Sequence, residues 1–140
     1  MALRVSVDTT FLIDLQRERT TPQKDGPAHR FLRRVPEAEL FLCAVALGEF
    51  AEGFESADHP SVRTVREHHT LLLVDDRTAE VYSSRVRELR SRGELIGTND
   101  LWIGASAVQH GLPLLTANAG EFRRVKGLEV IAYREAPAPA

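Results

Sequence analysis

The chain has 140 residues, which is enough for one domain with a genuine core. Its formal net charge is −2. A charge this small creates no general attraction to nucleic acid, so any such binding must come from local patches. The single cysteine, Cys43, lies in an apolar run and predicts a buried thiol in a reducing cytoplasm. We expect neither a signal peptide nor a membrane span. We expect one domain over residues 1–134 and a disordered tail over residues 135–140.

The first half of the chain alternates predicted strands with predicted helices. Alternating apolar residues predict a short strand over 3–7, and a nearly continuous apolar run over 39–45 is typical of a strand covered by helices on both faces. Polar residues 17–26 predict a loop or a frayed helix end. The predicted helices cover, in order, residues 8–15, 27–32, 46–53 and 60–69.

In the second half, a short apolar strand or extended link over 71–74 precedes a long helix over 77–92, which Gly93 stops. A further helix begins with Thr98 or Asn99 as its N-cap and ends at Gly111. Two more strands are predicted over residues 112–116 and 128–132, with a loop over 117–122 between them. Strands and helices in this alternation predict an α/β sandwich around a mainly parallel sheet.

The outer side of the predicted helix 77–92 is rich in arginine, whose planar fork suits phosphate. These side chains either form a phosphate-binding rim or belong to an ordinary solvated face, interleaved with Glu80 and Glu88. They are Arg85, Arg87, Arg90 and Arg92. The sequence alone leaves both alternatives open.

Three acids, Asp8, Glu49 and Asp100, each lie where an apolar segment meets a helix. Each has an ordinary alternative as a surface acid or cap near a helix start. Open α/β sheets, however, bind ligands at the carboxyl ends of their strands, where such junctions converge. Together with Asn118 or Glu121, the three acids predict an all-oxygen cluster that suits Mg²⁺ or Mn²⁺.

A cluster of this kind has a clear chemical use. Carboxylates brought within ~4 Å repel by on the order of 4 kcal/mol per pair at an effective dielectric near 20, and a divalent cation removes that repulsion. The cation also lowers the pKa of a bound water and stabilises charge on a phosphoryl oxygen. Phosphodiester hydrolysis therefore needs no protein nucleophile.

Competing catalytic motifs do not fit the sequence. The segment around Ser106 lacks the final glycine of a nucleophile elbow. We also find neither a P-loop nor a dinucleotide fingerprint in the sequence. The adjacent His68 and His69 point to different faces, without the cysteine pair of a zinc site. A haloacid-dehalogenase type phosphatase needs an aspartate where Thr10 stands.

Four segments in order look like the successive motifs of PIN-domain ribonucleases: VDTTFLI at 7–13, LGE at 47–49, GTNDLWIGA at 97–105 and LLTAN at 114–118. The segment EFRRVKGL at 121–128 strengthens the resemblance, especially to VapC-type toxins of bacterial toxin–antitoxin pairs. The resemblance covers about residues 3–132. It implies a PIN-like α/β/α sandwich with a mainly parallel central sheet.

The resemblance implies a Mg²⁺-dependent endoribonuclease in which Asp8, Glu49 and Asp100 hold the metal and activate water. Thr9 and Thr116 match hydroxyl positions that support the acids.

One position departs from the family pattern. The fourth acidic position, often Asp, is Asn118 here, and Glu121 three residues on is the other candidate to complete the site. We favour Asn118, because the resemblance places it directly. Glu121 has an ordinary alternative as a first-turn surface acid, and Thr10 stands where Asn or Ser is common.

The resemblance also implies partners. VapC-like proteins pair as homodimers, and a cognate antitoxin lays an amphipathic segment near the active site, where a basic side chain faces the acids. The implied substrate is RNA, and no base-reading motif in the sequence specifies which RNA is cut. The alternatives are a non-catalytic RNA- or protein-binding domain of the same fold and a DNA-directed or structure-specific nuclease.

Overall fold

The structure is a computed structural model that describes residues 2–21 and 25–135. Its centre is a parallel sheet with the strand order β3-β2-β1-β4-β5. The strands are β1 (Arg4–Val7), β2 (Glu39–Cys43), β3 (Thr70–Leu72), β4 (Leu114–Thr116) and β5 (Val130–Ala132). Parallel neighbours need crossover connections, which helices supply. The predicted sandwich around a parallel sheet is therefore confirmed.

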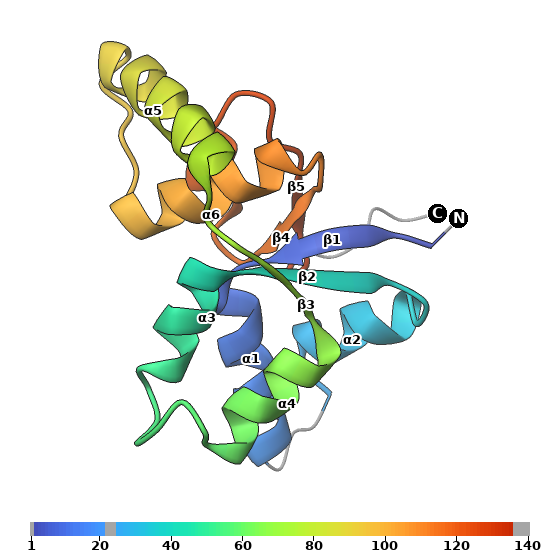
Figure 1. Cartoon of the computed structure of the whole chain (residues 1–140). Coiled ribbons are helices and arrows are strands. Elements are labelled where there is room, and N and C mark those ends of the chain that lie inside the picture. The colour runs from blue at the N-terminus through green and yellow to red at the C-terminus, as the bar shows by residue number, and fades with distance from the viewer. Residues whose placement is uncertain (1, 22–24, 136–140) are drawn as a thin grey trace.

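Helices cover both faces of this sheet (Figure 1). The helices are α1 (Thr9–Thr20), α2 (Pro27–Arg34), α3 (Ala44–Ala51), α4 (Pro60–His68), α5 (Asp76–Ser91), α6 (Thr98–Gln109) and α7 (Ala119–Phe122). Helices α1 to α4 lie on one side, and α5 to α7 lie on the other. The strand order reverses between β1 and β4. Ligand sites in open α/β sheets lie at such a switch point, beyond the carboxyl ends of the strands.

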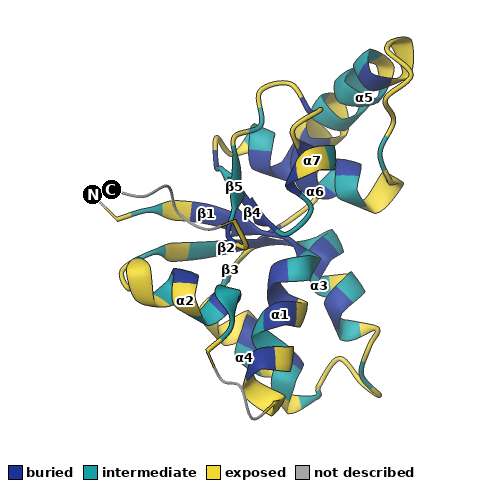
Figure 2. Cartoon of the chain, turned by 180° about the vertical axis from the view of Figure 1, so that it is seen from behind, coloured by how far each residue is buried: buried dark blue, intermediate teal, exposed yellow. Residues whose placement is uncertain are grey.

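The main core lies between the sheet and the two helical layers, where buried segments gather in Figure 2. Val5 and Val7 of the central strand are fully buried, and they pack with Phe11 of α1, Ile103 of α6 and Phe122 of α7. These contacts fix the starts of α1 and α6 and the position of α7 against the sheet edge. Cys43 is fully buried and free, as predicted.

A smaller cluster joins the α5–α6 hairpin to the segment after α7. Leu89, Leu101 and Val125 are buried together there. Tyr82 of α5 stacks on Trp102 of α6 with ring centroids 3.8 Å apart. Ile96 and Leu128 pack against both this cluster and the main core, so the hairpin is joined to the rest of the domain beside α6.

Several predicted boundaries are wrong by a few residues. Strand β2 ends at Cys43, and the predicted strand residues 44–45 begin α3 instead, which suits the high helix propensity of alanine. Gly97 is the N-cap of α6, where we predicted Thr98 or Asn99. The strands predicted over 112–116 and 128–132 are shorter, and a helical turn, α7, occupies the predicted loop.

Helix α1 continues to Thr20, into the stretch predicted as a loop or a frayed helix end. The reason is tertiary. Glu18 is buried and accepts hydrogen bonds from the backbone N–H groups of Ala28 at 3.0 Å and His29 at 2.9 Å. Because this carboxylate caps α2, the polar end of α1 is fixed by a partner distant in sequence.

The expected tail begins inside the described part of the chain. The Glu135 backbone N–H donates to the Ala132 carbonyl at 3.1 Å, and the Glu135 side chain pairs with Arg123 at 3.6 Å. The rest of the expected tail, residues 136–140, lies outside the described residues. Among the helices of the described residues, none is long and apolar enough to cross a membrane.

Candidate active site

Asp8 follows β1 directly and caps α1, at the switch point of the sheet. Its Oδ1 accepts hydrogen bonds from the Phe11 backbone N–H at 3.1 Å and the Thr10 hydroxyl at 2.6 Å, and its Oδ2 accepts one from the Thr116 hydroxyl at 2.5 Å. The residue is only 2% exposed. Burial raises the pKa of Asp8, and the hydrogen bonds from Thr10, Thr116 and Phe11 counteract that rise.

Glu49 reaches the same region from α3. Its Oε1 accepts a hydrogen bond from the Thr9 hydroxyl at 2.6 Å, and its Oε2 accepts one from the Asn99 side-chain amide at 3.2 Å. Glu49 lies in the second half of the helix, so the ordinary interpretation as a first-turn surface acid is wrong. The contacts tie α3 to both α1 and α6 through one carboxylate.

Asp100 lies in the first turn of α6, as predicted. Burial and the negative charges of Glu49, Asp8 and Glu121, in that order, raise the pKa of Asp100 to about 6. Helices α3, α6 and α7 and the β1–α1 junction therefore bring four carboxylates into mutual electrostatic range. Within the described residues, no hydrogen bond reaches the Asp100 carboxylate to offset that repulsion.

The end of β4 completes the arrangement. The Thr116 hydroxyl, which donates to Asp8, also accepts a hydrogen bond from the Asn118 backbone N–H at 2.8 Å. The Asn118 side-chain amide donates to Glu121 Oε2 at 3.2 Å. Asn118 and Glu121 are thus direct partners, whereas the sequence presented them as alternatives.

Thr10 has a role that our sequence analysis missed. Its hydroxyl donates to Asp8 and accepts a hydrogen bond from the Ala117 backbone N–H at 3.0 Å, which bridges the ends of β1 and β4. The contact with Asp8 had a local signal that could have predicted it, namely a hydroxyl two residues after a capping aspartate. The second contact depends on strand pairing and has no local signal.

The donor set suits a hard divalent cation, because it consists of carboxylate and amide oxygens. Glu49 and Asp100, with residues 97–99, line an open cavity of about 330 Å³. In the described ranges 2–21 and 25–135, no three acidic, histidine or cysteine side chains are gathered tightly enough to form a ready-made metal cluster. The acids therefore suit a cation in two ways: their oxygens are the preferred ligands, and a cation would relieve their mutual repulsion. They lie in one region but are not gathered into a compact cluster.

The arginines of the predicted helix 77–92 do not form a phosphate-binding rim. The Arg85 Nε donates to the Lys126 carbonyl at 2.8 Å, and Arg92 pairs with Glu88 at 2.6 Å. Arg87 is exposed to solvent, as is Arg90. This part of α5 fits the alternative of a charged, solvated helix face.

Comparison with known proteins places these features in a family. The sequence model of the PIN domain matches residues 5–128. The chain is 26% identical over 133 residues to ribonuclease VapC1 of Rickettsia felis, covering 89% of this chain and 92% of that protein. It is 29% identical over 130 residues to ribonuclease VapC1 of Methanocaldococcus jannaschii, covering 91% of this chain and 86% of the relative.

A solved structure shares the fold. The crystal structure of VapBC2 from Rickettsia felis, bound to a DNA fragment from their promoter, superposes with a TM-score of 0.78 at 17% identity, over 92% of this chain and 98% of that one. The sequence match runs from β1 to beyond α7 and includes Asp8, Glu49, Asp100 and Asn118. The chain belongs to the PIN domain family, and within that family it is similar to the VapC ribonucleases.

Proposed function

We propose that this protein is the toxin of a toxin–antitoxin pair and acts as a Mg²⁺-dependent endoribonuclease. The observation that carries the proposal is the placement of four acids within electrostatic range at the switch point, where burial and the other three charges raise the pKa of Asp100 to about 6. Curated relatives over most of the chain are named ribonuclease VapC, which supports RNA as the substrate. The cytoplasm is the proposed compartment.

In this proposal Asp8, Glu49, Asp100 and Asn118 hold Mg²⁺, or Mn²⁺ in its place. When bound, such a cation lowers the pKa of a coordinated water and stabilises charge on a phosphoryl oxygen. Asp8 contributes a fixed charge, because buried hydrogen bonds from Thr10 and Thr116 hold and favour its ionised form. The orientation of Asp8 therefore does not depend on the ligand.

The other acids are held less firmly. Thr9 and Asn99 orient the Glu49 carboxylate, one on each oxygen. Asp100 has a pKa of about 6, so it carries its full charge only well above that pH. We propose that Asp100 is the group that gains most from a cation, since its charge is the one that like-charged neighbours oppose.

The decisive experiment is cleavage of total cellular RNA by the purified protein with and without Mg²⁺. Asp8→Asn serves as the inactive control, and single-stranded and duplex DNA are tested in parallel. Cleavage of DNA alone would favour the structure-specific or DNA-directed alternative. Metal-independent RNA binding without cleavage would favour the non-catalytic binding domain, and unaltered cleavage by Asp8→Asn would show that these acids are not the site.

We also propose a cognate antitoxin as partner, because the neighbouring folds include VapBC complexes, among them VapBC-1 from Haemophilus influenzae. An amphipathic antitoxin segment would place a basic side chain beside the acids and compete with the cation. Co-expression with the adjacent open reading frame should yield a complex and relieve toxicity. If co-expression gave no complex and no relief of toxicity, the proposed antitoxin partner would be contradicted.

We further propose that the toxin is a homodimer, as the resemblance implies. Light scattering at micromolar concentration should give twice the mass of the chain. A monomer under these conditions would contradict this part of the proposal.

A further inference from the structure

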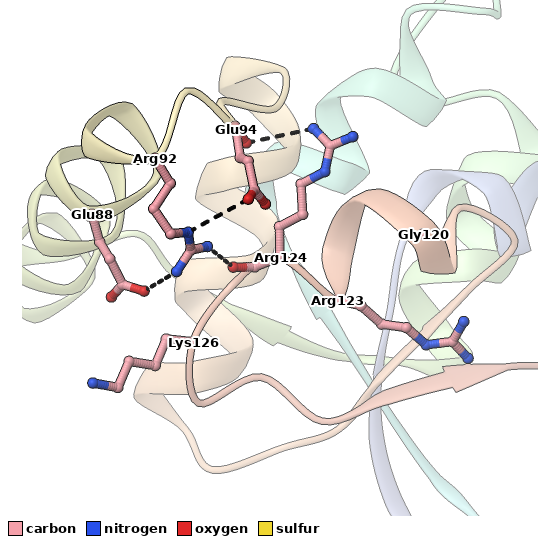
Figure 3. Close-up of a pocket in the computed structure, with 7 residues that line it drawn as sticks. All are labelled: Glu88, Arg92, Glu94, Gly120, Arg123, Arg124 and Lys126. Carbon is pink, nitrogen blue, oxygen red and sulfur yellow. Dashed lines mark hydrogen bonds and ion pairs between the residues drawn. The ribbon is translucent and has the colours of Figure 1, made fainter.

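A second cavity lies between the end of α5 and the segment that follows α7. Its volume is about 630 Å³, and we call it the basic cavity. Its lining residues are Glu88, Arg92, Glu94, Gly120, Arg123, Arg124 and Lys126 (Figure 3). Cations outnumber carboxylates among them, although the whole chain has a net charge of −2. A local positive patch of this kind is what a slightly acidic protein needs in order to bind nucleic acid.

Arg92 pairs with both acids of this cavity, so its one positive charge offsets one of their two negative charges. Its Nη1 pairs with Glu88 at 2.6 Å, and its Nε lies 3.9 Å from the Glu94 carboxylate. Its Nη2 donates to the Arg124 carbonyl at 2.8 Å. Arg92 therefore braces the cavity wall, and the three remaining cations still outnumber the one carboxylate that Arg92 leaves uncompensated.

Those cations have weak partners or none within the described residues. Lys126 has no ion pair or side-chain hydrogen bond there, and Arg124 makes one long hydrogen bond, 3.5 Å, to the Glu94 carbonyl. Arg123 pairs with Glu135 at 3.6 Å, with side chains 53% and 64% exposed. Exposed pairs of this type contribute little to stability, so phosphate can replace the carboxylate at little cost.

The three cations are spread along the cavity. Figure 3 shows the side chains of Lys126 and Arg123 pointing in opposite directions, with Arg124 between them and pointing in a third direction. A compact anion such as a free phosphate cannot meet groups that diverge in this way. A chain of phosphates can, because a nucleic acid strand presents its charges at regular intervals.

The basic cavity adjoins the carboxylate site through α7. Gly120 lines the cavity, and Glu121, the next residue, accepts a hydrogen bond at 3.2 Å from the side-chain amide of Asn118 in the carboxylate site. A strand with one phosphodiester at the acids would therefore have neighbouring phosphates over the cavity. Resting on the proposed function, we propose that the basic cavity binds backbone phosphates of the substrate RNA beside the cleavage site, with Arg123, Arg124 and Lys126 as the contacts.

The test measures RNA binding without cleavage. Fluorescence anisotropy of a labelled single-stranded RNA of about a dozen nucleotides is recorded in chelator over a series of salt concentrations, for the wild type and for Arg124→Gln/Lys126→Gln. The matched control, Arg63→Gln/Arg66→Gln, removes the same charge from exposed positions on α4, on the other side of the sheet.

Loss of the two cavity contacts should weaken RNA binding about tenfold at low salt and reduce the slope of log Kd against log salt by about 1.4, at roughly 0.7 per single-strand phosphate contact. The control should change the slope by much less. Equal slopes for the two double variants would overturn the inference, as would a wild type with no measurable RNA affinity at low salt.

A second pair of variants adds charge in place of removing it. A Cβ at Gly120 would have no heavy atom within 4 Å, so a longer side chain fits there. Gly120→Glu should weaken RNA binding more than Gly120→Gln, which has the same shape without the charge. Because these measurements need no metal, a wild type that binds through the cavity but never cleaves would refute the proposed function and leave the cavity inference standing.

Discussion

Asp8 and Asp100 belong to the same site but are held in different ways. Asp8 is almost fully buried, yet two hydroxyls and a backbone N–H donate to it. Asp100 is half-buried, without such donors in the described part of the chain, and it faces three other carboxylates. Burial raises the pKa of both acids, but only Asp8 has hydrogen bonds that favour its charged form.

This difference follows from the elements that carry the acids. Asp8 and Thr116 stand at the ends of paired central strands, where the register Val7↔Leu115 fixes their separation. Asp100, Glu49 and Glu121 come from three helices that reach the site from different directions. The strand side is therefore preorganised, while the helix side is the part that we propose adjusts to a cation.

Removing an acid from either side should have the largest effect on activity. Asp8→Asn, Glu49→Gln and Asp100→Asn should each reduce Mg²⁺-dependent RNA cleavage at least about 100-fold, since each removes a charge from the reacting centre. Circular dichroism should show that each variant remains folded. Cleavage within a few-fold of wild type by any one of them would remove that acid from the proposed site.

Removing a hydroxyl should expose the difference between the firmly and loosely held acids. Thr116→Val deletes a buried donor to Asp8, which raises the pKa of Asp8 further and should move the acid limb of the pH–rate profile to higher pH. We expect a loss of about tenfold in activity and of about 1–2 kcal/mol in the free energy of unfolding.

Thr9→Val is the matched comparison, because it deletes a hydroxyl donor to the less buried Glu49. Thr9→Val should therefore reduce the activity and the free energy of unfolding less than Thr116→Val does. If Thr9→Val shifted the pH–rate profile as far as Thr116→Val, the strand side of the site would not be the more preorganised one.

The parts of the fold that the sequence predicted are those set by local pattern. Apolar runs located β1, β2, β4 and β5, while the stretch that holds β3 was predicted as either a strand or an extended link. Gly93 and Gly111 end helices with φ values of 68° and 64°, a conformation that glycine adopts easily. The polar end of α1 escaped prediction because Glu18 is buried against α2, where its partners lie 10 and 11 residues along the chain. No local pattern carries that contact.

The site shows the same division. The positions of Asp8 and Asp100 at element junctions could be read from the sequence, because junctions follow from hydrophobic periodicity. The contact of Thr10 with Ala117 and the charge of Glu121 near Asp100 could not, since both depend on how β4 and α7 meet the rest of the domain. Pairing between elements decides those details.

Neutralising Asp100 should stabilise the metal-free protein. The pKa of Asp100 rises from 3.8 to about 6 on folding, so below pH 3.8 the acid is protonated in both states and costs nothing. Between those values the unfolded chain loses its proton first, and above about pH 6 the folded state carries a constant penalty. Asp100→Asn should therefore raise the free energy of unfolding at pH 8 by roughly 1 kcal/mol, after allowance for solvent screening.

Urea unfolding in chelator at pH 8 and pH 3.5 measures this gain. The gain should vanish at the lower pH, and added Mg²⁺ should reverse it at the higher one by stabilising only the wild type. A gain that persists at pH 3.5 would indicate a cause other than the charge of Asp100.

The smallest expected effect concerns the residues that complete the helix side. Asn118 uses its amide nitrogen to donate to Glu121, which leaves the amide oxygen available to a cation. Glu121 then acts mainly by holding Asn118 and by adding charge at longer range. Asn118→Ala should weaken Mn²⁺ binding about tenfold, at the low end of the losses for groups that orient metal ligands, and Glu121→Gln should weaken it less.

The measurement is Mn²⁺ titration by calorimetry at pH 8, where Asp100, with a pKa of about 6, is ionised. Asn118→Asp is the sharpest comparison, because it restores the acid common at this position and removes the hydrogen bond to Glu121. If Asn118 contributes a ligand oxygen, the added charge should tighten Mn²⁺ binding relative to wild type. If Glu121→Gln weakens binding more than Asn118→Ala, Glu121 is the fourth ligand, and Asn118 only positions it.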